Sequence, residues 1–203
     1  MVREATFSFG TKAETLQELQ PRLTKSTIPE FMYFNVQEWA NDPEKILGKI
    51  NSRFGQEKLV VRSSSVFEDT DDTAMAGVHT SVVDVDSGPN GDLKGSIDSV
   101  ILSYKKSLSE SNGRNQVLVQ LMIFDVSMSG VVFTQDLNTG APYYVINYDD
   151  VSGSTETVTS GEGEYSNRTM YIYREQVGSL RSERFQILLN ALIELEGVMK
   201  SKF

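Results

Sequence analysis

The sequence predicts a mixed α+β fold whose strands and helices are divided between two lobes. Short β-branched or alternating runs, typical of strands, are interleaved with stretches in which apolar residues recur at helical spacing. The order of these segments lacks the regular strand–helix–strand alternation that produces a doubly wound parallel sheet. With 203 residues, of which 39% are hydrophobic, the chain can form one sizeable domain or two small lobes.

Helix signals occur at three places in the first half of the chain. Leu16, Leu19 and Leu23 recur at helical spacing after a Gly-Thr-Lys run, which predicts a loop followed by a short helix. The run Asn-Asp-Pro-Glu at residues 41–44 combines a cap residue, an early proline and an acid, which together mark a helix start. The clearest amphipathic helix of this half covers residues 92–108.

Strands are expected where β-branched and aromatic residues form compact runs. Residues 58–62, Lys-Leu-Val-Val-Arg, end at a serine-rich loop, and residues 168–173 alternate Met or Ile with Tyr as in a half-buried strand. A long amphipathic helix from about residue 182 closes the chain. The expected strands are residues 31–34, 58–62, 81–85, 117–123, 130–134, 143–147 and 168–173.

Composition and charge exclude several classes of protein. The net charge is -9, from 28 acidic and 19 basic residues, and no basic stripe is segregated that could bind nucleic acid. The absence of cysteine excludes disulfides and thiolate metal sites. No apolar run approaches the roughly 18 to 20 residues of a membrane span. We therefore expect a cytoplasmic protein that binds neither nucleic acid nor membranes, and that holds any polyphosphate ligand through a few individual cations.

The stretch from residue 59 to residue 85, LVVRSSSVFEDTDDTAMAGVHTSVVDV, is the most informative candidate site. A strand would bring Arg62 to its end, where a guanidinium can bind two phosphate oxygens at once. Gly77 would let backbone N–H groups approach an anion closely. The alternative is structural, because Arg62 could instead pair with Glu68 or Asp69 in a surface turn.

Four ordered blocks resemble the phosphoenolpyruvate synthase/pyruvate phosphate dikinase family. The run VRSSSVFEDTDDTAMAGVHTSVVDV is similar to its phosphate loop, V-R-S-S-x-x-x-E-D followed by A-G and a strand. Residues 117–140 resemble its V-Q-x-M, S-G-V-x-F-T and T-G elements. Residues 10–16 resemble its G-G-K-x-x-x-L, and residues 155–161 its G-E-x-V-V-x-G. The resemblance implies the family's ATP-grasp fold, with two mixed lobes, about 1–110 and 111–203, enclosing a nucleotide cleft.

The resemblance also implies a role for individual residues. Lys12 would contact nucleotide phosphates, although a plain solvated lysine is the alternative. Arg62 would bind the phosphates and act as the catalytic cation that stabilises charge during phosphoryl transfer. Gln120 and Met122 would lie where a strand leads into the hinge that recognises adenine, although Met122 could equally pack in the core. The implied ATP-binding residues are Lys12, Arg62, Gly77, Ser81, Val82, Gln120, Met122 and Glu156.

The sequence departs from the family pattern at several points. Gln135 and Asp136 follow the F-T element where relatives often have an arginine or an apolar residue, and two residues differ between Gly153 and Glu156 in the G-L-G-E motif. His79, the single histidine, is expected to be a loop residue rather than a phosphoryl acceptor.

The resemblance also concerns the end of the sequence. The family's magnesium-binding acids and its final Q-x-R-P segment would lie beyond Phe203, the last residue given. We therefore expect a partial domain that has no metal ligands within residues 1–203 and is inactive when isolated.

The parent protein is expected to be an ATP-dependent phosphotransferase. Its ATP-binding domain would pass a phosphoryl group from ATP, with magnesium, to a histidine on a partner domain, and an acceptor domain would follow elsewhere in the chain. The alternative is a non-catalytic module that keeps the fold for partner binding or regulation.

Overall fold

The chain has an α+β fold, as the sequence predicts, and the strands of both described sheets pair antiparallel. The computed structural model describes residues 7–65, 80–88, 91–106, 114–153, 155, 158 and 168–200. These residues form two compact units. The first contains the described residues up to Met122 together with the end of the last helix from Gly197, and the second is Ile123–Glu196.

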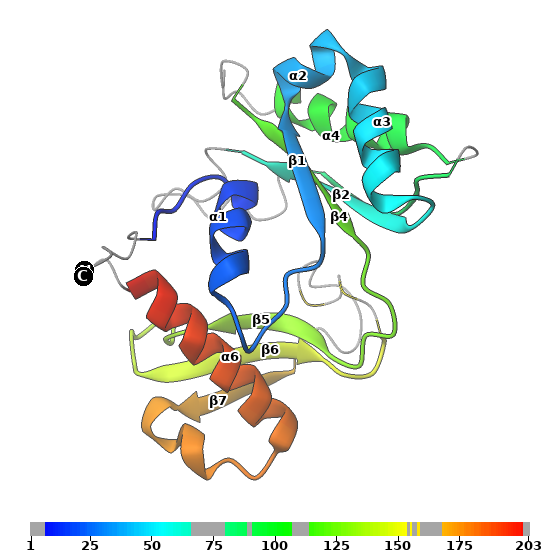
Figure 1. Ribbon diagram of the computed structural model, residues 1–203. Coiled ribbons are helices and arrows are strands. Elements are labelled where there is room, and N and C mark those ends of the chain that lie inside the picture. Colours follow the sequence, from blue (N-terminus) through cyan, green and yellow to red (C-terminus); the bar gives the residue numbers. More distant parts are fainter. Residues whose placement is uncertain are drawn as a thin grey trace. The chain divides into compact units, whose positions relative to one another are not determined.

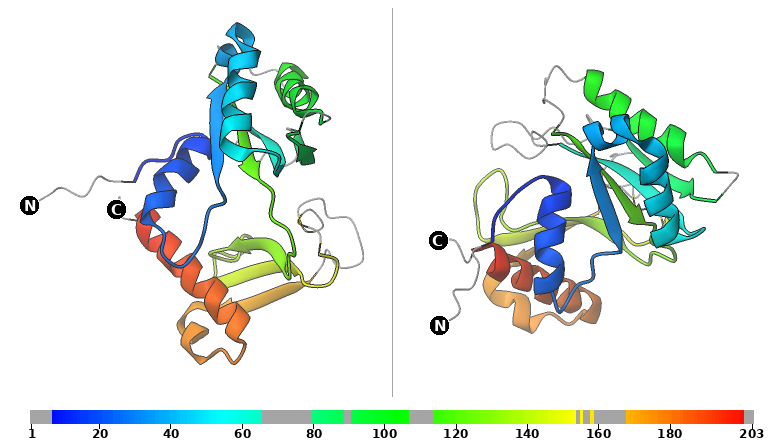
Figure 2. Two further views of the ribbon diagram at one scale, coloured as in Figure 1. Left: turned by 45° about the vertical axis from the view of Figure 1, so that its right-hand side comes forward. Right: turned by 45° about the horizontal axis from the view of Figure 1, so that its top comes forward.

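The first unit is built on a four-stranded sheet. Its strands are β1 (Phe31–Asn35), β4 (Gln116–Leu121), β2 (Lys58–Ser64) and β3 (Ser81–Asp86), in that spatial order, and every neighbouring pair is antiparallel. The helices α2 (Val36–Asn41), α3 (Pro43–Phe54) and α4 (Leu93–Lys106) lie on one side of this sheet (Figure 1). The helix α1 (Lys12–Leu19) lies on the other side, as the two views of Figure 2 show.

Strand alternation divides the apolar residues of this sheet between its two faces. On the face towards α3 and α4, fully buried strand residues pack against Trp39, Ile50 and Ile97 from the helices. On the other face, Ala13 of α1 packs against Phe31 and Leu118 in a smaller cluster. The strand residues of the larger core are Phe34, Leu59, Val61, Val85, Val117 and Val119.

The boundaries of the helices follow their capping residues. Thr11 caps α1, and the helix ends at Leu19 because Pro21 follows within the 3-10 turn η1 (Gln20–Arg22). This is earlier than the leucine spacing predicts, since Leu23 lies outside the helix. Asp42 accepts a hydrogen bond from the backbone N–H of Lys45 and caps α3, which confirms the predicted helix start.

The second unit is a three-stranded antiparallel sheet covered by one long helix. Its strands are β5 (Ser129–Phe133), β6 (Tyr143–Asp149) and β7 (Thr169–Tyr173), with β6 in the middle. The short turn η2 (Arg174–Ser179) leads to α6 (Glu183–Lys200). The core between this helix and the sheet consists of Tyr144, Ile146, Ile172, Val177, Phe185 and Leu189.

A hydrogen-bonded cluster ties α6 to the sheet of the second unit. Both guanidinium NH2 groups of Arg174 donate to the carboxylate of Glu196, at 2.9 and 2.7 Å, and the hydroxyl of Tyr144 donates to the same carboxylate at 2.8 Å. The guanidinium also lies over the ring of Tyr144, 4.3 Å from its centroid. The end of α6 is thus fixed to β6 and to the turn after β7.

The strand that the sequence analysis assigns to the second lobe, residues 117–123, corresponds to β4. It lies in the middle of the first unit's sheet, and the two units meet in the sequence after Met122. Among the described helices, none is both long and apolar enough to cross a bilayer.

Candidate functional site

Three of the candidate residues, Arg62, Ser81 and Gln120, share one face of the first sheet. Val61 points into the core beneath α3 and α4, so its neighbour Arg62 lies on the opposite face. Arg62 is paired with Leu118 of β4 on one side and with Ser81 of β3 on the other. Gln120 lies two residues further along β4 on the same face, and Met122 is the first residue beyond the end of that strand. The site face of this sheet is therefore the one on which α1 packs.

One nitrogen of the Arg62 guanidinium group is buried. Its Nε is inaccessible to solvent, and no acceptor bonds to it among the residues that the structure describes. An unpaired buried donor costs roughly 1–3 kcal/mol, so a ligand that brings acceptor oxygens to this nitrogen would recover that free energy. Glu68 and Asp69, the partners in the structural alternative, lie outside the described residues.

Lys12 approaches the same part of β2 from α1. It is the first residue of the helix, and its Nζ donates to the carbonyl oxygen of Ser63 at 3.5 Å. Ser63 directly follows Arg62, so two cationic side chains border one short segment at the end of β2. Two cations at one strand end form a setting that favours a polyanionic ligand.

The first turn of α1 is attached to the sheet by a buried polar network. The amide oxygen of Gln116 accepts hydrogen bonds from the hydroxyls of Thr11, at 2.5 Å, and Ser64, at 3.3 Å. Its amide nitrogen donates to Glu14 at 2.9 Å. The hydroxyl of Ser64 accepts from the backbone N–H of Ala13 at 2.9 Å. The N-terminus of α1 is therefore bonded to both central strands of the sheet.

The sequence does not predict this network as a whole, although one part of it, the cap of α1, has a recognisable residue spacing. Thr11 and Glu14 have the spacing of a capping box, and the structure has both of its reciprocal hydrogen bonds. The backbone N–H of Thr11, together with the side chains of Gln116 and Thr11, holds the pKa of Glu14 below its usual 4.5, against the opposing effect of burial. The part played by Gln116 could not be read from the sequence, because it depends on how β4 pairs with β2.

Gln120 and Met122 both make hydrogen bonds within the first unit. The amide nitrogen of Gln120 donates to the carbonyl oxygen of Pro29 at 3.4 Å. The backbone N–H of Met122 donates to the carbonyl oxygen of Lys58 at 2.9 Å. The side chains of both residues are half-buried. The backbone N–H of Met122 is therefore already bonded within the unit.

Ser81 and Val82, the candidates from β3, are separated by the sheet. Ser81 is exposed and lies beside Arg62, whereas Val82 packs against the core on the helix side of the sheet. Any ligand contact from Val82 on the Arg62 face would therefore use its backbone.

The other positions that the sequence analysis singled out lie outside the described residues. They include two implied ATP-binding residues, the single histidine, and the last residue, beyond which the family's magnesium-binding acids are expected. These positions are Gly77, Glu156, His79 and Phe203. The expectations attached to them remain predictions.

Asp136, one of the departures from the family pattern, has a local structural role. Its Oδ1 accepts from the backbone N–H groups of Asn138 and Thr139, at 3.0 and 2.8 Å, and from the hydroxyl of Thr139 at 2.9 Å. These bonds, led by the backbone N–H of Thr139, lower the pKa of Asp136. The carboxylate thus closes a turn, which ends at Gly140 with a φ of 68°.

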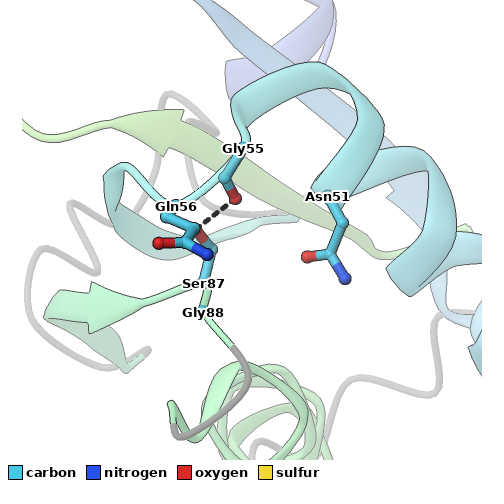
Figure 3. Close-up of a pocket in the computed structure, with 5 residues that line it drawn as sticks. All are labelled: Asn51, Gly55, Gln56, Ser87 and Gly88. Atoms are coloured by element: carbon cyan, nitrogen blue, oxygen red, sulfur yellow. Dashed lines mark hydrogen bonds between the residues drawn. The ribbon is translucent and has the colours of Figure 1, made fainter.

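A cavity of about 420 Å³ lies elsewhere on the first unit. It is formed where α3 ends and β3 leaves the sheet, and it is lined by Asn51, Gly55, Gln56, Ser87 and Gly88 (Figure 3). The hydroxyl of Ser87 bonds to the carbonyl oxygen of Gly55 at 2.9 Å and closes one wall. These residues adjoin the start of β2, whereas Lys12 and Arg62 lie towards its other end, so the cavity contains none of the candidate residues.

Comparison with known families supports one assignment. The family model of the pyruvate phosphate dikinase AMP/ATP-binding domain matches residues 11–186, a range that begins at the N-cap of α1 and includes every candidate residue. No curated protein matches the chain. Since the match spans most of the 203 residues, the chain belongs to the pyruvate phosphate dikinase AMP/ATP-binding domain family.

Proposed function

We propose that this chain binds ATP and places its phosphates at the strand end bordered by Lys12 and Arg62. The observation that carries the proposal is the buried Nε of Arg62, which has no partner among the described residues. A phosphate oxygen is a strong acceptor for a guanidinium, and the charge-assisted hydrogen bond gains strength where water is excluded. The family's description as an AMP/ATP-binding domain supports the nucleotide as the ligand.

The order of residues along the sheet supports an orientation for the nucleotide. Lys12 and Arg62 lie at one end of the site face, and Gln120 and Met122 follow along β4 in the other direction. Strand residues two apart are about 7 Å from each other, so the row of residues from Arg62 to Met122 is long enough to separate the phosphates from the base. The adenine would accordingly lie near Gln120 and Met122, with Ser81 beside the phosphates. Gly77, Glu156 and the backbone of Val82 keep the roles that the resemblance assigns to them.

The proposed activity of the parent protein is phosphoryl transfer. The β-phosphoryl group of ATP would pass to a histidine on a partner domain, and Arg62 would stabilise the charge that develops on the transferred group. Magnesium is expected with the nucleotide. Among the described residues, however, no group of three or more Asp, Glu or His side chains could hold a metal ion, so we assign no magnesium ligand within them.

Replacement of Arg62 tests the binding site directly. Arg62→Ala should weaken ATP binding by about 1.5–3 kcal/mol, which is the value of a hydrogen bond to a charged group. Arg62→Lys should recover only part of this loss, because an ammonium group cannot bind two oxygens in the planar geometry of a guanidinium. Isothermal titration calorimetry in the presence of magnesium measures both changes.

The matched control is Arg53→Ala. Arg53 pairs with Glu30 at 2.8 Å on the exposed surface of the same unit, so its loss should leave ATP affinity unchanged. Equal affinities of the wild type and a folded Arg62→Ala protein would assign Arg62 to a structural role.

The alternative function, a non-catalytic ATP-binding module, requires a separate measurement. The full-length parent protein would be incubated with ATP labelled at the β-phosphoryl group. Acid-labile label on the protein, the signature of a phosphohistidine, would support the transferase. Tight retention of ATP without labelled protein would support the module that binds but does not transfer.

A further inference from the structure

The buried amide of Gln116 joins the two parts of the first unit that carry the cations. Gln116 is the first residue of β4, where it pairs with Ser64, and two residues further along Leu118 pairs with Arg62. Its side chain reaches across to α1 and bonds to Thr11 and Glu14, the residues on either side of Lys12 and Ala13. A single side chain thus links the strand beside Arg62 to the helical turn that begins with Lys12.

The orientation of this amide is determined by its neighbours. The carboxylate of Glu14 can only accept a hydrogen bond, so the Gln116 NH2 group must face it. The amide oxygen then faces the hydroxyls of Thr11 and Ser64, both of which can donate. Only 8% of Gln116 is exposed, and Thr11 and Ser64 are buried as well. Reversal of the amide would place its oxygen against the carboxylate, so the network has one favourable arrangement.

Tyr104 of α4 bonds to the adjoining ends of β2 and β4 from the opposite face of the sheet. Its hydroxyl donates to the backbone carbonyl of Gln116 at 2.6 Å and accepts from the backbone N–H of Ser64 at 2.8 Å. The ends of β2 and β4 are therefore held together where α1 attaches. Little freedom remains for the first turn of α1 relative to β2.

We infer that Gln116 is a positioning residue, which sets the location of Lys12 relative to Arg62 so that both can bind one polyphosphate chain. The inference rests on the proposed function, because it assigns the purpose of the network to that site. Two cations bind a phosphate chain best when their spacing is fixed before the ligand arrives, since no ordering cost is then incurred on binding. Lys12 has a long flexible side chain, so its helix must supply this order.

A double-mutant cycle tests the inference. Gln116→Ala should weaken ATP binding about three- to tenfold, the effect of one or two hydrogen bonds. The affinity for adenosine, which has the same base and sugar but no phosphate, should stay unchanged. In a Lys12→Ala background, Gln116→Ala should have no further effect on ATP binding, because the group that it positions is absent. Calorimetry provides the ATP affinities, and NMR titration provides the weaker adenosine affinities.

Gln17→Ala is the matched control, because it also removes a glutamine that links α1 to the sheet. The hydroxyl of Tyr33 donates to Gln17 at 2.6 Å, away from the first turn of the helix. This variant should bind ATP like the wild type.

A second pair of variants covers the case in which Gln116→Ala does not fold. Thr11→Val removes the hydroxyl that bonds to Gln116 and also caps α1, so its weakening of ATP binding should vanish in the Lys12→Ala background, whereas Thr11→Ser keeps both bonds and should bind ATP like the wild type.

The possible outcomes separate this inference from the proposed function. If ATP and adenosine affinities fall together, or if Gln116→Ala has the same effect with and without Lys12, the role of Gln116 is structural and the inference is overturned. If Lys12→Ala binds ATP as tightly as the wild type, the proposed role of Lys12 fails, and the inference fails with it. Loss of ATP affinity that depends on Lys12, in Gln116→Ala or in Thr11→Val but not in Thr11→Ser, supports the inference.

Discussion

At the scale of single residues, the partners of a charged group determine what it contributes. Glu14, Asp136 and Arg62 all lie near turns or element ends. Glu14 and Asp136 accept hydrogen bonds from nearby backbone N–H groups, which makes their charges part of the local structure. Arg62 differs, because its buried Nε has no such partner among the described residues. A buried donor without a structural partner is the better candidate for a ligand-binding role.

The pKa of Glu14 leads to a prediction about acid stability. The backbone N–H of Thr11 and the side chains of Gln116 and Thr11 lower this pKa below 4.5 in the folded chain. A carboxyl group with a lowered pKa stabilises the fold above its unfolded value and loses that contribution as the pH falls through the folded value. Glu14→Gln should therefore be less stable than the wild type at pH 7, and the difference should shrink below pH 4.5.

Thermal unfolding followed by the fluorescence of Trp39, the single tryptophan, measures this difference between pH 7 and pH 3. Glu44→Gln is the control, since the side chain of Glu44 is 81% exposed. A difference between Glu14→Gln and the wild type that stays constant with pH would contradict the assigned role of Glu14.

Individual site residues were predictable from the sequence to different degrees. The strand that ends near Arg62 and the loop that leads to a helix at Lys12 follow from local patterns, and both are present. Alternation along a strand predicts that Ser81 and Val82 point to opposite faces, but which of them lies beside Arg62 was not predictable, because it depends on how β3 pairs with β2. The network around Gln116 was equally inaccessible, because its members come from three elements.

At the scale of elements, short helices depend on their attachments. The helix α1 has only eight residues, too few for stability in isolation, and it is retained by its capping box and by its contacts with β2 and β4. The long helix α6 is attached at its far end by the cluster of Tyr144, Arg174 and Glu196. Helix starts with capping residues were predictable, whereas the partners of these attachments were not, since they are distant in sequence.

The attachment of α6 should fail at high pH. Burial, followed by the hydrogen bond and negative charge of Glu196, raises the pKa of Tyr144 from 10.0 to about 12. A phenol with a raised pKa stabilises the fold fully below its unfolded value, and this contribution is lost as the pH rises from 10 towards 12. Tyr144→Phe should be less stable than the wild type at pH 8 and should lose less stability between pH 10 and 12.

Urea unfolding followed by circular dichroism at a series of pH values measures this effect. Tyr171→Phe is the control, because Tyr171 is 57% exposed on the neighbouring strand. If Tyr144→Phe and the wild type lose the same stability above pH 10, ionisation of Tyr144 does not limit the attachment.

At the scale of the whole molecule, the sequence predicted two lobes but not the composition of their sheets. Local periodicity identified the strands, yet sheet order depends on pairing between segments far apart in the chain. The β4 strand illustrates this, because it follows a long helix in sequence and nevertheless lies between β1 and β2. Its central position is what brings Gln116, Leu118 and Gln120 to the candidate site.

The separate cores of the two units lead to the last prediction. Ile97 is fully buried in the same core of the first unit as Trp39, and Leu189 is fully buried in the core of the second. Replacement of either by alanine should lower the free energy of unfolding of its own unit by about 2–5 kcal/mol.

Ile97→Ala should therefore lower the urea midpoint reported by Trp39 fluorescence. Leu189→Ala should leave that midpoint unchanged while it lowers a transition seen by circular dichroism. Ile187→Ala, at a position of α6 that is 61% exposed, should change neither. A shift of the Trp39 midpoint in Leu189→Ala would instead mean that the two units unfold as one cooperative structure.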